Sequence, residues 1–575
     1  DPGLTRMLSS ARTDPGSGGN RDPGGLQPGV LAALHETGEH RHAALLHERV
    51  DQVEGRAVPA HDENAAGGIL RAAGPQAGQE AGKPQDPVWD RAGDRGMGLV
   101  HGGDTQSGHA RLGLSAREGA HDGAWNLHVQ RPGLGSVRGQ ALHCLPMRLL
   151  LLLLPLGLSA CGSMGDTPPN VLILCMDTLR ADRLGCYGGT GNLTPNLDAL
   201  AAQATLWETC SASSPWTVPS HASMFTGKNP SAHGAYSFEV EDMSVDNCFT
   251  LEEEQWTLAE ALRDEGYATA GIVANAVYLK SEFGLSQGFD HWRISRERAP
   301  RLCNNILDWI DGRTQEGSSD SPWILFVNFM DTHRPYNVEP LPGEREYDQA
   351  SEYSSDLPNR LYQQVIVRGE EAGELGLNLQ EQYNRAVRNL DLALGEFFAR
   401  LKERGVWDDL LLVVISDHGE YFGGHGLVEH SKDVYEPALS VPLIIKYPGQ
   451  TAGEIRTERA SSAHLPALVL DGLPSEIADH LAQDFPLRPG VGPVLSENHY
   501  SRLPDILHPT VGARFRRVRT VLYDGPHKLI QSSDGKHELY HLGEDPGETV
   551  LRNDLDYFRM HRMLEALSEE LKGTE

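Results

Sequence analysis

The chain has 575 residues, of which 39% are hydrophobic and 23% charged, so its composition is that of a globular protein long enough for more than one domain. Its formal net charge of −30 argues against nucleic-acid binding, which needs clustered Lys and Arg to neutralise phosphates. The same acidity disfavours docking on anionic lipid through a basic surface.

Residues 1–146 differ in composition from the rest of the chain. They contain no Phe and no Tyr, and Lys83 and Ile69 are their single Lys and single Ile. A segment so poor in aromatic and β-branched side chains cannot bury enough apolar area to offset its conformational entropy. It is either a disordered extension or an upstream stretch absent from the working protein, with translation starting at Met147. The residues after Met147 favour the second interpretation.

Residues 147–160 have the three-part layout of a secretory signal: one positive charge, a run of six Leu, and small residues before Cys161. The run is too short to span a bilayer, which takes about 20 apolar residues. Leu158-Ser159-Ala160-Cys161 resembles the lipobox of bacterial lipoproteins, a family in which the Cys is acylated and becomes the mature N-terminus. The resemblance implies a lipid-anchored protein of the cell envelope. Gly162 resembles lipoproteins sent to the outer membrane, which in a Gram-negative cell places the protein on its periplasmic face.

The chain contains seven Cys, which we consider as candidates for a zinc site or for disulfides. One precedes the proposed start and Cys161 carries the proposed lipid. The remaining five are an odd number, so at least one is free, and their spacings suggest neither a zinc site nor a disulfide framework. These five are Cys175, Cys186, Cys210, Cys248 and Cys303.

From Asn170 onward, short apolar runs alternate with helical patterns, which predicts a mostly parallel sheet covered by helices. Near-continuous apolar runs are typical of strands buried on both faces. Four such runs are expected to be strands of this sheet, at residues 171–176, 268–274, 323–330 and 410–416.

Each of the four runs ends in side chains that can carry chemistry. In open α/β sheets, ligands bind just beyond the carboxyl ends of the strands. A single Asp after a strand is usually a turn or helix-cap residue, but four polar endings together favour a metal or catalytic cluster. The residues are Asp177, Asn275, Asp331-Thr332-His333 and Asp417-His418-Gly419-Glu420.

Thr217 lies at or just before the start of a predicted helix. Pro219 fits the first turn of that helix, and Gly227 fits the position just past its end. The helix dipole and the free N–H groups at this point favour an anion. A plain N-cap is the alternative role for Thr217. The presence of Asp177 and Asp417 in the same predicted cluster favours a metal-bound nucleophile over an N-cap.

These motifs resemble the sulfatase family of the alkaline-phosphatase superfamily. Its pattern C/S-x-P-S-R-x-x-x-L-T-G appears here as TVPSHASMFTG at residues 217–227. Flanking segments that resemble the family occur in the same order, at residues 170–187, 416–425, 441–449 and 528–548. The resemblance implies a mostly parallel central sheet sandwiched by helices, in a catalytic domain over residues 170–465. It also implies a smaller C-terminal α+β subdomain over residues 466–575, and residues 161–169 are then a linker.

The resemblance implies one divalent metal ion, held by Asp177, Thr217, Asp417 and His418. Oxygen ligands with one imidazole suit Mg²⁺, Ca²⁺ or Mn²⁺, and Zn²⁺ stays possible. His333 and His430 fall where the family places residues that contact the ester or protonate its leaving group. Lys432 and His425 are weaker candidates, expected to be solvated or to lie behind the ligands.

Three departures from the family pattern bear on the chemistry. Thr217 stands where sulfatases convert a Cys or Ser to formylglycine, an aldehyde that Thr cannot form. His221 replaces the motif Arg, and we assign it to substrate binding. Asn275 stands near the position of a family G-K-W-H segment that is absent here. An Asn there resembles phosphodiesterases, phosphonate ester hydrolases and nucleotide pyrophosphatases, in which it contacts a phosphoryl oxygen.

The chemistry of a Thr nucleophile favours phosphoesters. An activated Thr217 hydroxyl can attack phosphorus and give a phospho-enzyme that water cleaves, whereas a sulfate ester on Thr has no easy exit. We therefore expect a hydrolase of phosphodiesters or phosphonate esters, borne by a small molecule, glycan or lipid. Two alternatives stay open: a sulfatase acting on sulfated glycans or aryl sulfates, and a transferase that passes a phosphoryl-linked group to an envelope acceptor.

Overall fold

A computed structural model of the chain describes residues 168–239, 248–315, 321–336 and 356–572. The predicted extension, the signal segment and Cys161 lie outside these residues. Among the residues that the structure describes, no helix is both long enough and apolar enough to cross a membrane. The five cysteines within these ranges are all free thiols.

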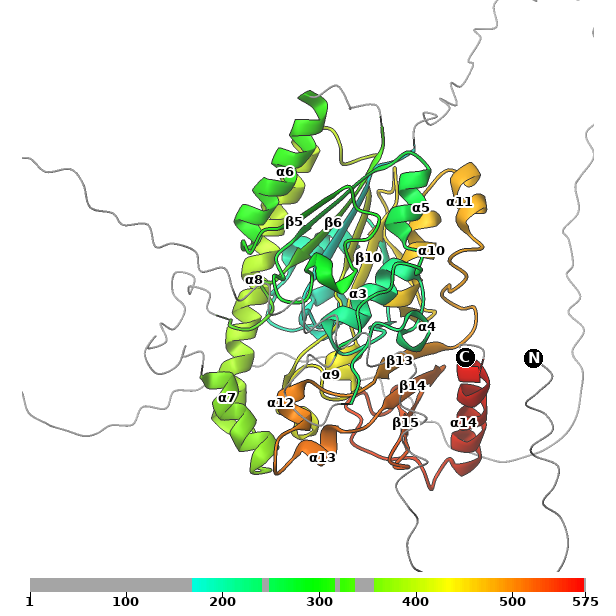
Figure 1. Ribbon diagram of the computed structural model, residues 1–575. Helices are drawn as coiled ribbons and strands as arrows, with labels where there is room; N and C mark the ends of the chain where they lie inside the picture. Colours follow the sequence, from blue (N-terminus) through cyan, green and yellow to red (C-terminus); the bar gives the residue numbers. More distant parts are fainter. Residues whose placement is uncertain (1–167, 240–247, 316–320, 337–355, 573–575) are drawn as a thin grey trace, which may run out of the picture. The chain divides into compact units, whose positions relative to one another are not determined.

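The central element is an eight-stranded sheet (Figure 1). Its parallel and antiparallel pairings give seven strands one direction and leave β10 as the antiparallel exception. In spatial order the strands are β11 (Glu454–Arg456), β2 (Thr205–Trp207), β10 (Leu443–Lys446), β7 (Leu411–Ile415), β1 (Val171–Met176), β6 (Trp323–Phe329), β4 (Ala268–Val273) and β5 (His291–Ile294). The four predicted strands are β1, β4, β6 and β7, which are adjacent in the middle of the sheet.

The middle strands are buried on both faces, as their apolar runs predict. Every residue of β1 is buried, and its side chains alternate between two hydrophobic layers. Leu172 and Leu174 belong to the layer that includes helices α2, α6 and α8, whereas Val171 and Ile173 belong to the layer with α3, α5, α10 and α11. Figure 1 shows α6 and α8 on one side of the sheet and α3, α5 and α10 on the other.

The helices vary from one turn to 31 residues. The α-helices are α2 (Pro195–Ala201), α3 (Thr217–Thr226), α4 (Pro230–His233), α5 (Leu258–Asp264), α6 (Ala299–Gln315), α7 (Leu357–Tyr362), α8 (Gly373–Glu403), α9 (Glu436–Leu439), α10 (Leu465–Leu470), α11 (Ser475–Leu481), α12 (Leu503–Ile506), α13 (Gly512–Phe515) and α14 (Tyr557–Lys572). Short 3₁₀ turns occupy Ala181–Arg183, Gly185–Tyr187, Ser281–Phe283, Gly424–Gly426 and Ser462–His464, and a π turn occupies Gln363–Val367.

A separate antiparallel sheet follows near the C-terminus. Its strands pair in chain order: β13 (Val494–Asn498), β14 (Arg519–Asp524), β15 (His527–Ser532) and β16 (Glu538–His541). Helix α14 packs on this sheet, with Met563 and Leu567 buried against Leu522 and Leu529. Two short ladders, β3 (Cys210–Ser211) with β12 (Ala460–Ser461) and β8 (Tyr421–Phe422) with β9 (Val428–Glu429), complete the described strands.

These features confirm the predicted fold class, a mostly parallel sheet between helices with a smaller C-terminal α+β part. The C-terminal sheet begins at Val494, later than residue 466, where the sequence places the start of this subdomain. Helices α10 and α11 share a hydrophobic layer with β1, so they cover the central sheet.

Candidate functional site

The predicted metal ligands from two different strand ends converge. Asp177 follows β1, and Asp417 and His418 follow β7, its parallel neighbour in the sheet. One side-chain ligand atom from each of these three residues lies within 4.8 Å of the others, and all three side chains are fully buried. Parallel neighbours end at the same edge, which is why residues 240 positions apart in sequence meet here.

Thr217 joins this cluster from a third element. It is the first residue of α3, preceded by Trp216 in an extended conformation and followed at the other end by Gly227 in the left-handed conformation. The hydroxyl Oγ1 of Thr217 lies 3.5 Å from Nε2 of His418, and the residue is 2% exposed. No side-chain capping hydrogen bond is made at this helix start. The helix N-terminus therefore presents the hydroxyl to the cluster.

The hydrogen bonds around His418 leave one ring nitrogen as a free acceptor. Its Nδ1 lies 3.0 Å from the carbonyl oxygen of Gly419, which can only accept, so Nδ1 carries the proton. The unprotonated Nε2 then faces Oδ2 of Asp417 at 3.3 Å and Oδ1 of Asp177 at 3.9 Å. This is the arrangement in which a backbone partner fixes the tautomer of a metal-binding imidazole.

The two carboxylates each leave one buried oxygen without a partner. Oδ1 of Asp177 and Oδ2 of Asp417 make no hydrogen bond within the described part of the chain. Burial, and then the nearby Asp177 carboxylate, raise the pKa of Asp417 well above its usual range. Two orphaned carboxylate oxygens facing an imidazole lone pair are costly in a protein interior without a cation. The donor set of two carboxylates, one imidazole and one hydroxyl fits a divalent ion.

The other oxygens of these carboxylates are held firmly. Oδ1 of Asp417 accepts the backbone N–H groups of Thr178 at 3.1 Å and of His418 at 2.9 Å. Oδ2 of Asp177 accepts from the amide nitrogens of Asn275 at 3.0 Å and Asn328 at 3.4 Å. These partners orient the free oxygens toward the cluster.

Asn275 occupies the end of β4, as predicted, but most of its amide is already engaged. One N–H bonds to Asp177, while Oδ1 accepts the backbone N–H groups of Val277 and Tyr278. The residue is 2% exposed. One amide hydrogen is left for a substrate, so the main observed contact of Asn275 is with the predicted metal ligand.

His221 lies in α3 itself, one turn after Thr217, and its ring is buried. Its Nδ1 donates to the carbonyl oxygen of Thr217 at 2.8 Å and lies 3.6 Å from Oδ2 of Asp417. The ring is fully buried and packs edge-on against Phe225 and Phe326. Burial lowers the pKa of His221 to about 4, so the ring is neutral at pH 7. The predicted substrate contact of His221 stays a prediction, and the contacts observed are with Thr217 and Asp417.

His333 and His430 flank the cluster. The ring centroids of His430 and His418 are 4.6 Å apart, and those of His430 and His333 are 5.2 Å apart. Nδ1 of His430 lies 3.0 Å from the carboxylate of Glu420, and Nδ1 of His333 donates to the carbonyl oxygen of Arg334 at 2.7 Å. Burial, followed by the nearby imidazole of His418, lowers the pKa of His430.

Two residues in this network, Asn328 and Tyr336, were not singled out from the sequence, and the partners of Glu420 were not predicted. Glu420 holds His430 and accepts from the hydroxyl of Tyr336 at 2.7 Å, and Asn328 braces both Asp177 and Asn275. The signal for Asn328 was available, because it is an amide inside an otherwise apolar strand. Glu420 belongs to the predicted polar ending at residues 417–420, but nothing local indicated its partners. Of the weaker candidates, Lys432 is fully buried and so not solvated, and His425 stacks on Tyr435.

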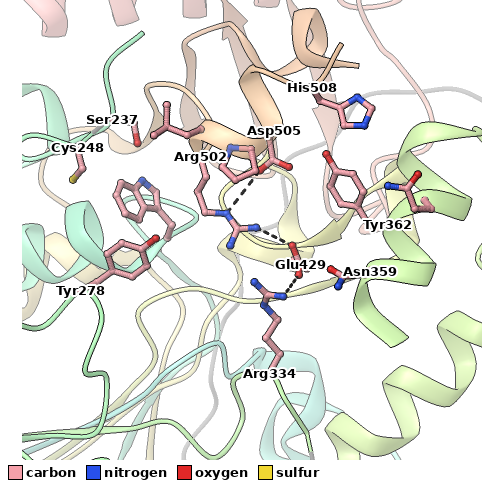
Figure 2. Close-up of a pocket in the computed structure, with 14 residues that line it drawn as sticks. Ser237, Cys248, Tyr278, Arg334, Asn359, Tyr362, Glu429, Arg502, Asp505 and His508 are labelled. Atoms are coloured by element: carbon pink, nitrogen blue, oxygen red, sulfur yellow. Dashed lines mark hydrogen bonds and ion pairs between the residues drawn. The ribbon is translucent and has the colours of Figure 1, made fainter. Parts of the chain in front are cut away.

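Figure 2 shows residues that line a pocket of about 560 Å³. Its lining includes Trp216, Arg334 and Glu429, which are sequence neighbours of Thr217, His333 and His430 respectively. The pocket lining therefore includes a direct sequence neighbour of each of the three residues that the sequence assigns to catalysis. Its walls combine aromatic rings with charged side chains.

Comparisons with known proteins identify the family of the chain. The model of the family described as Sulfatase matches residues 169–474, more than half of the chain. An ulvan-active sulfatase of Formosa agariphila is 25% identical over 457 residues, covering 71% of this chain and 83% of the relative. Human arylsulfatase A is 27% identical, covering 70% and 85%. The crystal structure of a phosphonate monoester hydrolase of Agrobacterium radiobacter superposes with a TM-score of 0.51 at 19% identity, covering 71% of this chain and 95% of that one.

Proposed function

This chain belongs to the sulfatase family, whose members are metal-dependent hydrolases of sulfate or phosphate esters, and we propose that its own substrates are phosphodiesters or phosphonate esters. The observation that carries the proposal is Thr217 at the N-terminus of α3, with Oγ1 3.5 Å from Nε2 of His418. A Thr cannot form the aldehyde with which sulfatases expel sulfate. A Thr ester of phosphate, in contrast, is cleaved by water.

We assign Asp177, Asp417, His418 and Thr217 as the residues that hold one divalent cation. The two partnerless carboxylate oxygens and the fixed tautomer of His418 support this assignment. When bound, the cation supplies positive charge that favours ionisation of the Thr217 hydroxyl and stabilises negative charge on the ester oxygens. Asn275 and Asn328 position Asp177, and we reassign His221 from substrate binding to support of Asp417 and the first turn of α3.

The reaction takes place in two displacements at phosphorus. Oγ1 of Thr217 loses its proton to water and bonds to phosphorus as the P–O bond to the leaving group breaks, and the leaving oxygen takes up a proton. Water then cleaves the bond between Thr217 and phosphorus, which restores the hydroxyl and releases the phosphoryl product. The free N–H groups at the start of α3 stabilise the anionic transferring group.

We propose His333 as the proton donor to the leaving group. Its Nδ1–H is engaged with a backbone carbonyl, so a proton for the ester is carried on Nε2 of the partly exposed ring. His430 is fully buried with a lowered pKa, and its Nδ1–H is directed at Glu420. His430 therefore contacts the ester as a neutral ring and gives up no proton.

Sulfate ester hydrolysis is the second candidate, because the relatives reported above are named as sulfatases. A side-by-side assay of an aryl sulfate, a phosphate monoester, a phosphodiester and a phosphonate ester tests the choice. We expect the phosphodiester or the phosphonate ester to be cleaved fastest. Much faster cleavage of the aryl sulfate would contradict the proposal. Repeating the assay with an alcohol acceptor tests for phosphoryl transfer, which would yield the phosphorylated alcohol.

We also propose that the protein works in the cell envelope, anchored by lipid on Cys161. The support is the lipobox-like sequence at residues 158–161, which lies outside the described residues. The described residues begin at 168, shortly after that cysteine in the sequence.

A further inference from the structure

The pocket contains a group of charged side chains around the buried carboxylate of Glu429. Glu429 is at its centre and accepts from Nη1 of Arg334 at 2.6 Å, from Nη2 of Arg502 at 2.8 Å and from Nζ of Lys432 at 3.2 Å. Figure 2 shows Arg334 and Arg502 reaching Glu429 from different sides. The three cations hold the pKa of Glu429 below its usual range in spite of burial.

Positive charge is in excess within this group. Asp505 is its second carboxylate, 3.4 Å from Nζ of Lys432 and 3.8 Å from Nε of Arg502. Three cations therefore share two carboxylates. The nearby Glu420 does not pair with them, since its oxygens bond to His430 and Tyr336. With three cations in direct contact with only two carboxylates, the pocket wall favours an anionic ligand.

The arrangement is unusual both in charge and in backbone conformation. The whole chain carries a net charge of −30, so a cationic excess here does not follow from composition. Glu429 has a φ of 66°, a left-handed conformation that is strained for a residue with a Cβ. Strain of this kind persists at sites where surrounding interactions hold it, and it points to function.

The two arginines retain donors for a ligand. Each guanidinium has five N–H groups, and its contact with Glu429 is through one terminal nitrogen, Nη1 of Arg334 and Nη2 of Arg502. Their side chains are 32% exposed at Arg334 and 22% exposed at Arg502, so both remain accessible from the pocket. Tyr278 and Tyr362 lie on opposite sides of the charged group (Figure 2). Aromatic flanks suit a ring or a carbon chain that carries an anionic substituent.

We propose that Arg334 and Arg502 bind a second oxyanion, a carboxylate, sulfate or phosphate, on the leaving group of the ester. The inference rests on the proposed function, because it takes the reacting ester to lie against Thr217. The preferred substrates are then esters whose alcohol or phenol carries its own negative charge. Glu429 positions the two guanidiniums, and Lys432 supplies the charge that an anionic ligand balances.

Binding of two phosphonates that contain no ester bond tests this inference without turnover. Phenylphosphonate carries one anionic group, and 3-carboxyphenylphosphonate adds a second on the same ring. Isothermal titration of the metal-loaded protein should show about 10-fold tighter binding of the carboxylated compound, the size expected for one charge-assisted contact. In Arg334→Gln and in Arg502→Gln we expect this preference to fall to about 2-fold or less.

Arg488→Gln is the matched control, since Arg488 is partly exposed, bonds to Asp471 and lies outside the pocket lining. It should keep the full preference. Equal binding of the two compounds by the wild type, binding of neither, or a preference that survives both pocket substitutions would overturn the inference. A protein that shows the preference but cleaves no phosphoester would instead contradict the proposed function and leave the anion site in place. Thermal melting of each variant checks that it is folded.

Discussion

Thr217 combines three properties that a nucleophile at this site needs: a hydroxyl, a helix N-terminus and contact with His418. We expect Thr217→Ala to abolish turnover of phosphodiesters, because no oxygen remains to attack phosphorus. Thr217→Ser should keep part of the activity, since the hydroxyl is retained and only a methyl group is lost. Loss of a nucleophile typically removes several powers of ten in rate, which steady-state kinetics will measure.

Thr226→Ala provides the control for this substitution. Thr226 is a buried Thr of the same helix, and its hydroxyl bonds to the carbonyl oxygen of Ala222. Its removal should lower stability and leave the rate constant of the folded enzyme within a few-fold. Mass spectrometry of acid-quenched wild type should find a phosphoryl group on the peptide that contains Thr217. Its absence under turnover conditions would refute covalent catalysis by this residue.

Asn275 acts mainly through Asp177 in the structure, so its substitution should affect metal binding. We expect Asn275→Ala to weaken metal affinity about 10- to 100-fold, as is typical when a partner of a metal ligand is lost. Calorimetric titration with Mg²⁺, Mn²⁺ or Ca²⁺ measures this change. An unaltered metal affinity together with a fall of about 10²–10³ in kcat would show instead that Asn275 contacts the transition state.

At the scale of elements, the ends of strands and of one helix assemble the site. β1, β4 and β7 deliver Asp177, Asn275 and Asp417 to one edge of the sheet, and the start of α3 brings Thr217 to the same place. Ser220 in the first turn of α3 ties the helix to this edge, donating to the carbonyl oxygen of Asp417 at 2.6 Å. The helix N-terminus is thereby held against the strand that carries two of the ligands.

The C-terminal sheet is joined to the catalytic part by a buried ion triad. Lys528 of β15 lies 2.8 Å from Glu436 of α9 and 2.7 Å from Glu548. Burial, opposed by the Lys528 ammonium and reinforced by the Glu436 carboxylate, raises the pKa of Glu548 from 4.5 to about 7. Two carboxylates thus compete for one ammonium, and the proton stays on Glu548 to a higher pH than in an unfolded chain.

This raised pKa predicts a pH dependence of stability. Between about pH 4.5 and pH 7 the folded state keeps a proton on Glu548 that the unfolded state has released, so the free energy of unfolding falls as pH rises through this window. Glu548→Gln removes the titrating group, and we expect its Tm to fall less than that of wild type over the same range. Glu544→Gln, at a largely exposed carboxylate, is the control. Parallel Tm curves for wild type and Glu548→Gln would contradict the assignment.

At the scale of the whole molecule, the metal should contribute to stability as well as to catalysis. A ligand that binds only the folded state stabilises it, by about 2.7 kcal/mol at a concentration 100 times its Kd. We therefore expect chelation to lower Tm and abolish activity, and metal addition to restore both. Asp417→Ala should be inactive, with a Tm that no longer responds to the metal. A metal response unchanged in Asp417→Ala would place the ion elsewhere.

The maturation of the chain is tested by fractionation of cells. If Cys161 carries lipid, the wild type should sediment with membranes and Cys161→Ser should appear in the soluble fraction. Purified mature protein should lack residues 1–160, which peptide mass spectrometry will detect. Peptides from residues 1–146 in the mature protein would contradict a start at Met147. Cys303→Ser, at a buried thiol of α6, is the control and should stay with the membranes.

The sequence by itself determined the elements and the chemical character of the site. Apolar runs marked β1, β4, β6 and β7 because strands buried on both faces cannot contain many polar residues. Pro219 and Gly227 marked the two ends of α3, since each has backbone preferences that suit one helix end. Asp177, Asp417 and His418 were identified because strand endings and motif spacing are local features, and the structure places all three together.

Only the tertiary structure decided which groups share a partner. Whether His221 faces a substrate or the metal-ligand cluster depends on which face of α3 packs on the sheet. In the structure the ring of His221 is buried, and its Nδ1 bonds to the carbonyl oxygen of Thr217. Glu420 bonds to His430, and Arg334 and Arg502 both contact Glu429. These contacts join residues from separate segments, and no sequence pattern encodes the distances between them. Side-chain contacts between distant segments follow from the packing of the whole chain. The pocket and its group of charged side chains can therefore be identified only from the tertiary structure.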